Sequence, residues 1–206
     1  MITFNRQWAA QAFSGVSGIA VHPPILPGLP FSFVYDGRPS ASLLGAWQCQ
    51  VQDEPVDATQ LHRTLTLADP QTGLEVRAEV TVYLDTPGVD WILYFTNTGS
   101  QETPVLESVK ALDVAIAPGP GRTPILHRLH GSAFRVDDWQ PFDDPLPGEK
   151  RIAFAPVGGK SAQGASPFFN VEWDGGGVIT AIGWSGQWEA SVARAKDGAL
   201  RIQAGQ

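Results

Sequence analysis

Cysteine, basic residues and long apolar runs are all scarce in this sequence. The one cysteine, Cys49, excludes an internal disulfide and leaves almost no room for a cysteine-based zinc site. Lys and Arg number 14 against 21 Asp and Glu, and the net charge is -7. This balance argues against nucleic-acid and anionic-membrane partners, because both require a basic patch. No segment approaches the roughly 18–20 consecutive apolar residues of a membrane-spanning helix.

The first eight residues lack a basic region followed by an apolar run, so no secretory signal is expected there. Together with the single cysteine, this favours a cytoplasmic location. The 43% hydrophobic and 17% charged residues are typical of a packed globular domain. The length favours one large β domain over residues 1–206, with two small domains as the alternative.

Apolar residues recur at every second position, which predicts strands rather than helices. Residues 74–84 place Leu74, Val76 and every second residue after them on one face, and polar side chains dominate the other face. Residues 89–97 carry bulky side chains on both faces, which predicts a central, covered strand. Residues 7–13 could form one short helix.

Strands are predicted along most of the remaining chain. Their ranges are 42–51, 59–68, 103–116, 125–129, 150–155, 167–173, 177–184, 187–193 and 200–203. Short strands at this spacing, separated by turn residues, predict an all-β fold, a large antiparallel β-sandwich. The alternation assigns Trp47, Cys49 and Trp91 to its core.

Catalysis by a glycosidase would need two carboxylates about 5–9 Å apart, facing each other across a sugar. The candidates are Asp137, Asp138, Asp143 and Asp144. Neighbouring acids on one loop point in different directions, so we assign no catalytic residue. The segment is either a solvated acidic loop or the rim of a neighbouring site.

Metal binding is not expected either. His127 and His130 lie three residues apart on a predicted strand, which puts them on opposite faces. They cannot share a metal in that arrangement, and no motif indicates another cofactor.

Tryptophan is the residue type that most favours sugar binding, because its ring packs on the apolar face of a pyranose and its N–H can donate a hydrogen bond. The sequence has seven Trp. Trp139 lies in a polar loop between Asp138 and Gln140, and Trp184 and Trp188 bracket a glycine turn. These five residues are the candidate sugar contacts. The alternative for Trp184 and Trp188 is ordinary core packing.

Several segments between about residues 70 and 195 form a recognisable series. They are Gly73–Tyr83, Asp90–Gly99, Leu129–Ser132, Asp138–Pro141, Gly158–Ser161, Pro167–Asn170 and Ala181–Trp188. The series resembles the N-terminal domain of glycoside hydrolase family 36, the α-galactosidases and their relatives. The most specific piece is Gly183-Trp184-Ser185-Gly186-Gln187-Trp188. Ala162 stands where the family has a second serine, and the first 70 residues match only in general character.

The resemblance implies a twisted, galactose-mutarotase-like β-supersandwich that packs against a (β/α)₈ barrel of the same parent chain. The family's catalytic Asp residues belong to that barrel. The resemblance therefore implies a non-catalytic N-terminal accessory domain of a retaining enzyme, with the loop Asp138–Pro141 as a pocket rim. A galactoside or other sugar and further copies of the chain are the other implied partners. The alternatives are a stand-alone carbohydrate-binding module and a purely structural assembly domain.

Overall fold

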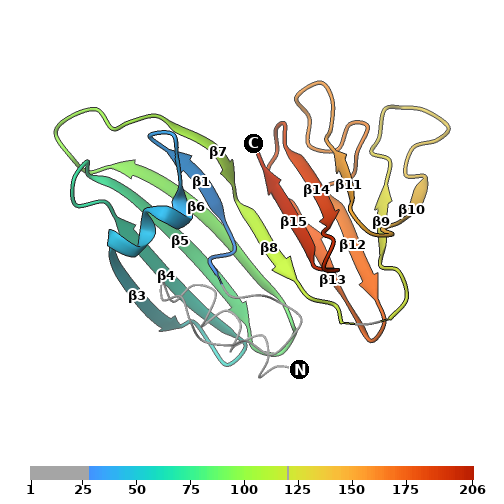
Figure 1. Cartoon of the computed structure of the whole chain (residues 1–206), viewed down its shortest axis with the longest axis horizontal. Helices are drawn as coiled ribbons and strands as arrows, with labels where there is room; N and C mark the ends of the chain where they lie inside the picture. Colours follow the sequence, from blue (N-terminus) through green and yellow to red (C-terminus); the bar gives the residue numbers. More distant parts are fainter. Residues whose placement is uncertain (1–27, 120) are drawn as a thin grey trace. The chain divides into compact units, whose positions relative to one another are not determined.

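The computed structural model describes residues 28–119 and 121–206 (Figure 1). Fifteen strands and two short 3₁₀ helices make up the regular structure of this part, so the all-β prediction is confirmed. The possible helix over residues 7–13 lies outside the described residues. No helix in the described ranges is long and apolar enough to span a membrane.

Contacts divide the chain into two compact units, whose described parts are residues 28–111 and Leu112–Gln206 without residue 120. We call them the first unit and the second unit and describe each by itself. A single domain over residues 1–206 stays a prediction.

The first unit contains two antiparallel sheets. Its elements are β1 (Ser32–Tyr35), β2 (Arg38–Pro39), η1 (Ser40–Ser42), η2 (Leu44–Ala46), β3 (Gln48–Pro55), β4 (Gln60–Ala68), β5 (Leu74–Tyr83), β6 (Val89–Asn97) and β7 (Leu106–Lys110). The sheet orders are β3-β4-β5-β6 and β2-β1-β7. The sheets meet where Phe33 of β1 lies edge-on to Phe95 of β6, with ring centroids 5.6 Å apart.

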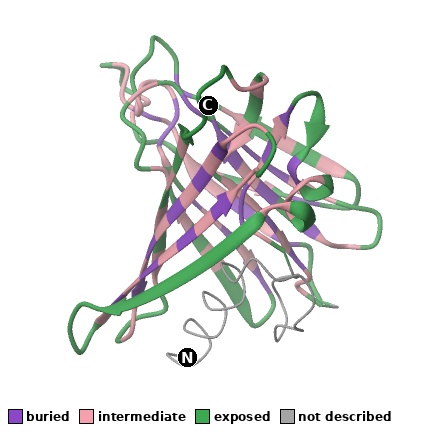
Figure 2. Ribbon diagram, turned by 90° about the vertical axis from the view of Figure 1, so that its left-hand side faces the viewer, coloured by how far each residue is buried: buried purple, intermediate pink, exposed green. Residues whose placement is uncertain are grey.

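Strand β5 follows the predicted alternation along its whole length. Its core-facing residues, from Leu74 to Val82, are at most 4% exposed, and the residues between them are only half-buried. Figure 2 shows the same alternation along the long strands. One-sided burial of this kind fixes the register, because a slip by one residue would turn the whole apolar set towards water.

Three sequence-based expectations are wrong at the outer strands of this sheet and beside them. Strand β6 is an edge strand rather than a central one, and Ile92 is 58% exposed. Strand β3 is the other edge, exposed at all eight positions. Cys49 pairs with Leu67 and points to the core side, yet it is exposed. Trp47 is only half-buried. Alternation predicts which face a side chain takes, but it does not predict how many strands flank it.

The second unit also contains two antiparallel sheets. Its strands are β8 (Leu112–Ile116), β9 (Ile125–Leu129), β10 (Pro141–Pro145), β11 (Lys150–Phe154), β12 (Phe168–Trp173), β13 (Gly176–Ala181), β14 (Glu189–Arg194) and β15 (Leu200–Gly205). The sheet orders are β10-β9-β12-β13 and β11-β14-β15-β8. Phe154 of β11 and Phe169 of β12 pack edge-on across the two sheets, with ring centroids 5.1 Å apart. Leu126, Val171 and Val192 are 0% exposed and form part of the same core. Both units are thus antiparallel β-sandwiches.

Candidate functional site

The loop between β9 and β10 holds three of the five candidate sugar contacts. Leu129 pairs with Pro141, and the His130 amide donates to the Gln140 carbonyl at 2.9 Å. Residues 130–140 connect the two strands and form what we call the β9–β10 loop, with residues 131–139 at its tip. The structure brings Asp138, Trp139 and Gln140 together on it, with Trp139 and Gln140 exposed.

Asp138 organises the β9–β10 loop from within. One carboxylate oxygen accepts from the Ala133 amide at 2.7 Å, and the other accepts from the Phe134 amide at 3.0 Å and the Ser132 hydroxyl at 2.9 Å. These bonds, led by the one from Ala133, lower the pKa of Asp138. The carboxylate is therefore ionised at neutral pH, and its structural task here is to fix the loop.

The β9–β10 loop holds large apolar side chains in water. Phe134 is 97% exposed and Trp139 is 52% exposed, while Val136 between them is fully exposed. Phe134 and Trp139 also have positive φ angles of 60° and 64°. Bulky residues rarely adopt this conformation, which costs about 1–3 kcal/mol each. Exposed aromatics on a strained, internally braced loop are typical of a contact surface.

A second loop, residues 155–167, supports the first. The Ser132 amide donates to the Ala162 carbonyl at 2.8 Å, and a side chain on Gly131 would lie 1.9 Å from that oxygen. Only glycine allows this approach. Trp188 donates its indole N–H to the Ser161 carbonyl at 2.8 Å. Three segments of the series described above thus meet through backbone carbonyls, so the missing serine hydroxyl at Ala162 leaves this contact intact.

The last two tryptophans differ sharply from each other. Trp184 is 50% exposed, as a sugar contact requires, but Trp188 is 1% exposed. Trp188 packs edge-on against Phe154 at 6.0 Å. Of the two alternatives given above for Trp188, the structure therefore shows core packing and not an exposed sugar contact. Trp188 comes directly before β14 and continues the core-facing set of Ala190 and Val192. The glycine turn before it hid this alternation in the sequence.

The acidic segment is also different from what its composition indicated. Asp143 and Asp144 lie on strand β10, not in a loop, and alternate between its faces. Asp144 accepts from Arg128 at 2.7 Å, and Asp143 contacts His127 at 2.6 Å. Asp144 is thus paired with the arginine Arg128 of β9, and Asp143 with the histidine His127, which carries a charge only when it is protonated.

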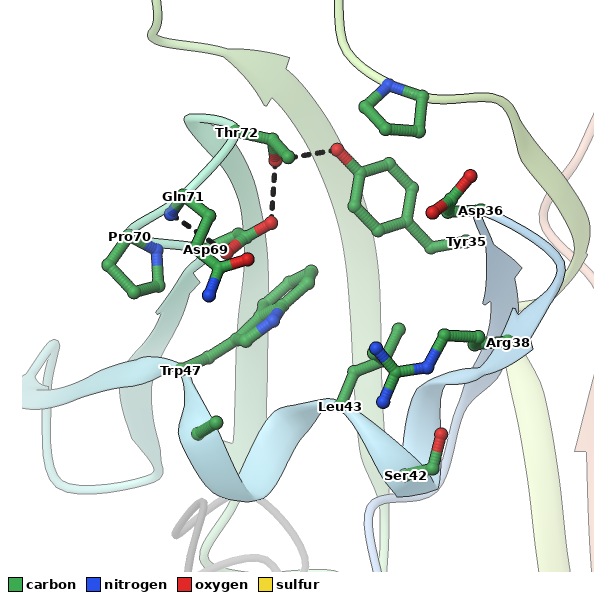
Figure 3. Close-up of a pocket in the computed structure, with 12 residues that line it drawn as sticks. Tyr35, Asp36, Arg38, Ser42, Leu43, Trp47, Asp69, Pro70, Gln71 and Thr72 are labelled. Atoms are coloured by element: carbon green, nitrogen blue, oxygen red, sulfur yellow. Dashed lines mark hydrogen bonds between the residues drawn. The ribbon is translucent and has the colours of Figure 1, made fainter.

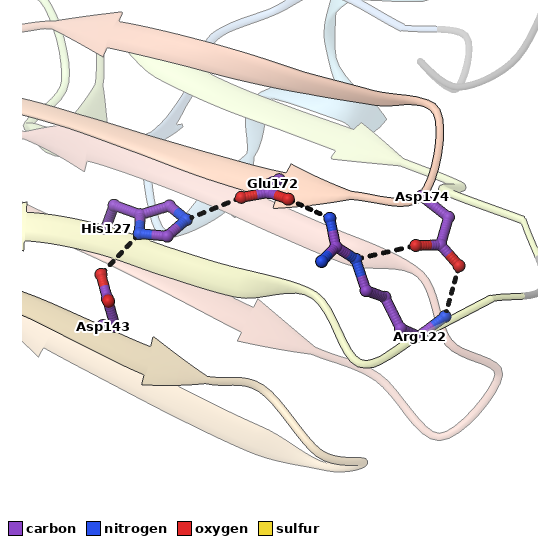
Figure 4. A network of polar contacts seen from close by, with 5 residues as sticks. All are labelled: Arg122, His127, Asp143, Glu172 and Asp174. Carbon is purple, nitrogen blue, oxygen red and sulfur yellow. Dashed lines mark hydrogen bonds and ion pairs between the residues drawn. The ribbon is translucent and has the colours of Figure 1, made fainter.

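Asp143 begins a polar network on the outer face of the second unit (Figure 4). The His127 imidazole lies between Asp143 and Glu172, whose carboxylate oxygen is 3.2 Å from its second nitrogen. Arg122 then bridges Glu172 and Asp174, and its Nε lies 2.8 Å from Asp174. The hydrogen bond that Asp143 accepts from His127 is the main cause that raises the pKa of His127. Protonation makes the imidazole a donor to both carboxylates.

A metal site is not formed by these groups. Among the described residues, no cluster of three or more His, Cys, Asp and Glu side chains could hold a metal ion. His127 is held within the acidic network, and His130 contacts the Asp137 carbonyl at 3.3 Å. The two histidines do not converge.

Sequence reasoning missed Phe134 and Val136, which share the exposed tip with Trp139. The signal was present as apolar residues inside a segment that lacks strand alternation. It also missed the network of Figure 4. Its members come from three separate segments, and no local spacing links Arg122 to Glu172.

No protein-family model matches the chain, and no curated protein matches it significantly. Solved structures do match. The family 36 α-galactosidase AgaB from Geobacillus stearothermophilus aligns with a TM-score of 0.57 and 16% identity over 87% of this chain and 26% of its own. The α-galactosidase from Lactobacillus brevis aligns with a TM-score of 0.57 and 12% identity over 92% and 27%.

The galactosidase domain of the α-galactosidase–sucrose kinase AgaSK aligns with a TM-score of 0.56 and 15% identity over 85% of this chain and 26% of its own. The chain thus spans about a quarter of the length of the solved structures it matches. At these identities the likeness concerns the fold. The chain has the fold of a part of the family 36 α-galactosidases.

Proposed function

We propose that this chain is a non-catalytic accessory domain of a retaining α-galactosidase-like glycoside hydrolase. It supports a (β/α)₈ barrel of the same parent protein and contributes the β9–β10 loop to the rim of the substrate pocket or to an oligomer interface. The parent would hydrolyse terminal α-galactosides.

The observation that carries this proposal is the difference between the two aligned shares, that of this chain and that of the enzymes it matches. Nearly all of this chain aligns with enzymes of which it spans only about a quarter. The solved proteins are α-galactosidases. The chemistry would then belong to the remainder of the parent, which fits the involvement of Asp143 with His127 and of Asp144 with Arg128 in this part.

The β9–β10 loop is the contact surface that supports the rim assignment. Its aromatic tip is braced by Asp138 and by the second loop through Ala162. A braced loop loses little conformational entropy on docking, so its exposed side chains contribute more of their contact energy to binding. Trp139 offers a flat apolar ring and one N–H donor, which suits the edge of a sugar pocket.

The test begins with the purified 206-residue chain and p-nitrophenyl α-galactoside. We expect no hydrolysis above buffer, and cleavage by the chain alone would overturn the non-catalytic role. The second step is to express the complete open reading frame that contains the chain. We expect α-galactosidase activity and strand–helix alternation in the additional sequence. An inactive product without such a region would contradict the proposal.

A stand-alone carbohydrate-binding module is the second candidate, favoured by the exposure of Trp139 and Trp184. Titration calorimetry of the chain with galactose, melibiose and raffinose tests it. Heat that disappears in Trp139→Ala or Trp184→Ala would favour the module. Heat unchanged in both variants, or no heat at all, would count against it.

A further inference from the structure

The first unit contains a hollow of about 160 Å³ that is separate from the β9–β10 loop. Three segments form its walls: the hairpin of β1 and β2, the 3₁₀ helices with Trp47, and the turn between β4 and β5 (Figure 3). This volume is below the roughly 300–1,000 Å³ that is typical of sites for drug-sized ligands. It suits one small ring.

One wall of the hollow is a tight hairpin. Asp36 and Gly37 have φ angles of 52° and 68°, which is the backbone of a type I′ turn and the usual use of an Asp-Gly pair. The Asp36 amide donates to the Val105 carbonyl at 3.1 Å. The turn therefore fixes the backbone that carries the side chains of Asp36 and Arg38.

The opposite wall is braced by a hydrogen-bonded chain. The Asp69 carboxylate accepts from the Gln71 amide at 3.0 Å and from the Thr72 hydroxyl at 2.6 Å. Because the Thr72 proton is used in this way, the Tyr35 hydroxyl donates to Thr72 Oγ1, at 2.6 Å. Asp69, Thr72 and Tyr35 are thus occupied with each other and form a rigid wall.

Three side chains that line the hollow are available to bind a ligand. Trp47 is half-buried, with Tyr35 edge-on to it at a centroid distance of 6.0 Å. In Figure 3 its indole lies between the Asp69–Thr72 turn and Arg38. Within the described residues, neither Arg38 nor Asp36 has a side-chain hydrogen bond or ion pair, although both line the same hollow.

Trp47, Arg38 and Asp36 determine which kind of ligand fits the hollow. Arg38 can only donate hydrogen bonds, and Asp36 can only accept them when ionised. A hydroxyl group does both, so a ligand with several hydroxyls can satisfy the two side chains together. The charges of Arg38 and Asp36 cancel, and both residues are exposed. Attraction for a charged ligand is weak at such solvated groups.

We propose that this hollow is a binding site for one neutral, polyhydroxylated ring, such as a single pyranose. The ring lies on the open face of Trp47, and Arg38 and Asp36 bind its hydroxyls from the hairpin side. This site does not rest on the proposed accessory role, because all the residues that form it belong to the first unit.

The test uses the purified chain labelled with ¹⁵N, and follows the indole N–H signal of Trp47 in NMR spectra. Trp47→Phe identifies that signal among the seven tryptophans. D-galactose, D-glucose and D-mannose are titrated separately, with glycine as a zwitterionic probe and sodium acetate as an anionic one. We expect a saturable shift with at least one sugar, with a dissociation constant on the order of 1–10 mM for so few atoms.

Two variants locate the binding. Arg38→Ala and Asp36→Asn should each weaken sugar binding about tenfold, and Asn tolerates the positive φ of position 36. Arg151→Ala, an exposed arginine of β11 in the second unit, is the matched control and should bind as the wild type does.

Several results would overturn the proposal. They are no sugar shift of the Trp47 signal up to about 100 mM, stronger binding of glycine or acetate than of every sugar, or unchanged affinity in Arg38→Ala and Asp36→Asn. Loss of the shift in Trp139→Ala would place the sugar on the β9–β10 loop and contradict this site. Failure of the accessory role would instead appear in the enzyme assay, with the Trp47 titration unaffected.

Discussion

The sheets of the two units differ in the length of their strands and in how far apart in the sequence the paired strands lie. In the first unit, β3, β4, β5 and β6 follow one another in both sequence and space. Strand β3 has eight residues and the other three have nine or ten. In the second unit every strand has five or six residues, and the sheet β11-β14-β15-β8 joins strands from distant parts of the chain. Local pairing thus dominates the larger sheet of the first unit, and non-local pairing is common in the second.

This difference shows where specific contacts are needed. A long meander is held by repeated local register, as in β5, and each residue adds a similar contribution. Short strands supply fewer ladder bonds, so the second unit depends on single contacts between loops, such as Gly131 with Ala162 and Trp188 with Ser161. Point substitutions at these contacts should therefore be unusually costly.

The largest effect is expected at Trp188. Trp188→Ala removes a buried ring and its hydrogen bond to the Ser161 carbonyl, and should lower the free energy of unfolding by about 3–5 kcal/mol. Trp184→Ala, at a half-exposed position four residues earlier, should cost less than about 1 kcal/mol. Urea unfolding followed by circular dichroism measures both. Equal losses would remove the distinction between the two tryptophans.

The second largest effect on stability is expected at Gly131. Gly131→Ala places a methyl group against the Ala162 carbonyl, and should cost about 1–3 kcal/mol as the two loops separate. Gly148→Ala is the matched control, because nothing lies within 4 Å of its added carbon. It should change the free energy of unfolding by no more than about 0.5 kcal/mol. A Gly131→Ala protein as stable as the control would disprove the close contact.

Asp138 should affect the order of the β9–β10 loop more than global stability. Asp138→Ala removes three accepted hydrogen bonds, so amide hydrogen exchange at Ala133 and Phe134 should accelerate at least about tenfold. Asp138→Asn keeps one oxygen acceptor and should give an intermediate rate. Unchanged exchange in Asp138→Ala would mean that the loop is held by other contacts.

The smallest effect should come from His127, and it should depend on pH. Its folded-state pKa lies above the unfolded value of about 6.5, so protonated His127 stabilises the fold below that pH. This contribution is lost as the pH rises through the folded-state pKa. The Tm difference between the wild type and His127→Gln should be a few degrees at about pH 5.5 and smaller at about pH 8.5.

Asp143 provides the control for that measurement, because it makes the main hydrogen bond to His127. In an Asp143→Asn background, most of the pH dependence of the His127→Gln effect should disappear. A Tm difference that grows with pH would contradict the assigned cause.

The sequence predicted the first unit's meander well because its information is local. Alternation from Leu74 to Val82 specifies a strand, a face and a register without knowledge of the rest of the chain. It did not predict that β3 and β6 are edges, since strand order depends on pairing partners. Residues 32–35 escaped detection because four residues are too few for a clear period.

The candidate site was predictable only in part. A loop rich in polar residues around Trp139 indicated exposure, and Trp139 is indeed exposed. Asp138 is ordinary in sequence, and its role follows from three donors that the folded loop aims at one carboxylate. The role of Gly131 depends on a carbonyl 31 residues away, at Ala162, which no local pattern reveals.

The most direct test of the central claim is a kinetic measurement on the protein encoded by the complete open reading frame that contains this chain, which the proposal expects to be an α-galactosidase. If the β9–β10 loop forms the pocket rim, Trp139→Ala should raise the KM for raffinose about 5- to 10-fold with kcat nearly unchanged, because a single stacking contact is lost. Phe168→Ala, a comparably exposed aromatic residue on β12, is the control. Identical KM values for Trp139→Ala, Phe168→Ala and the wild type would contradict the rim assignment.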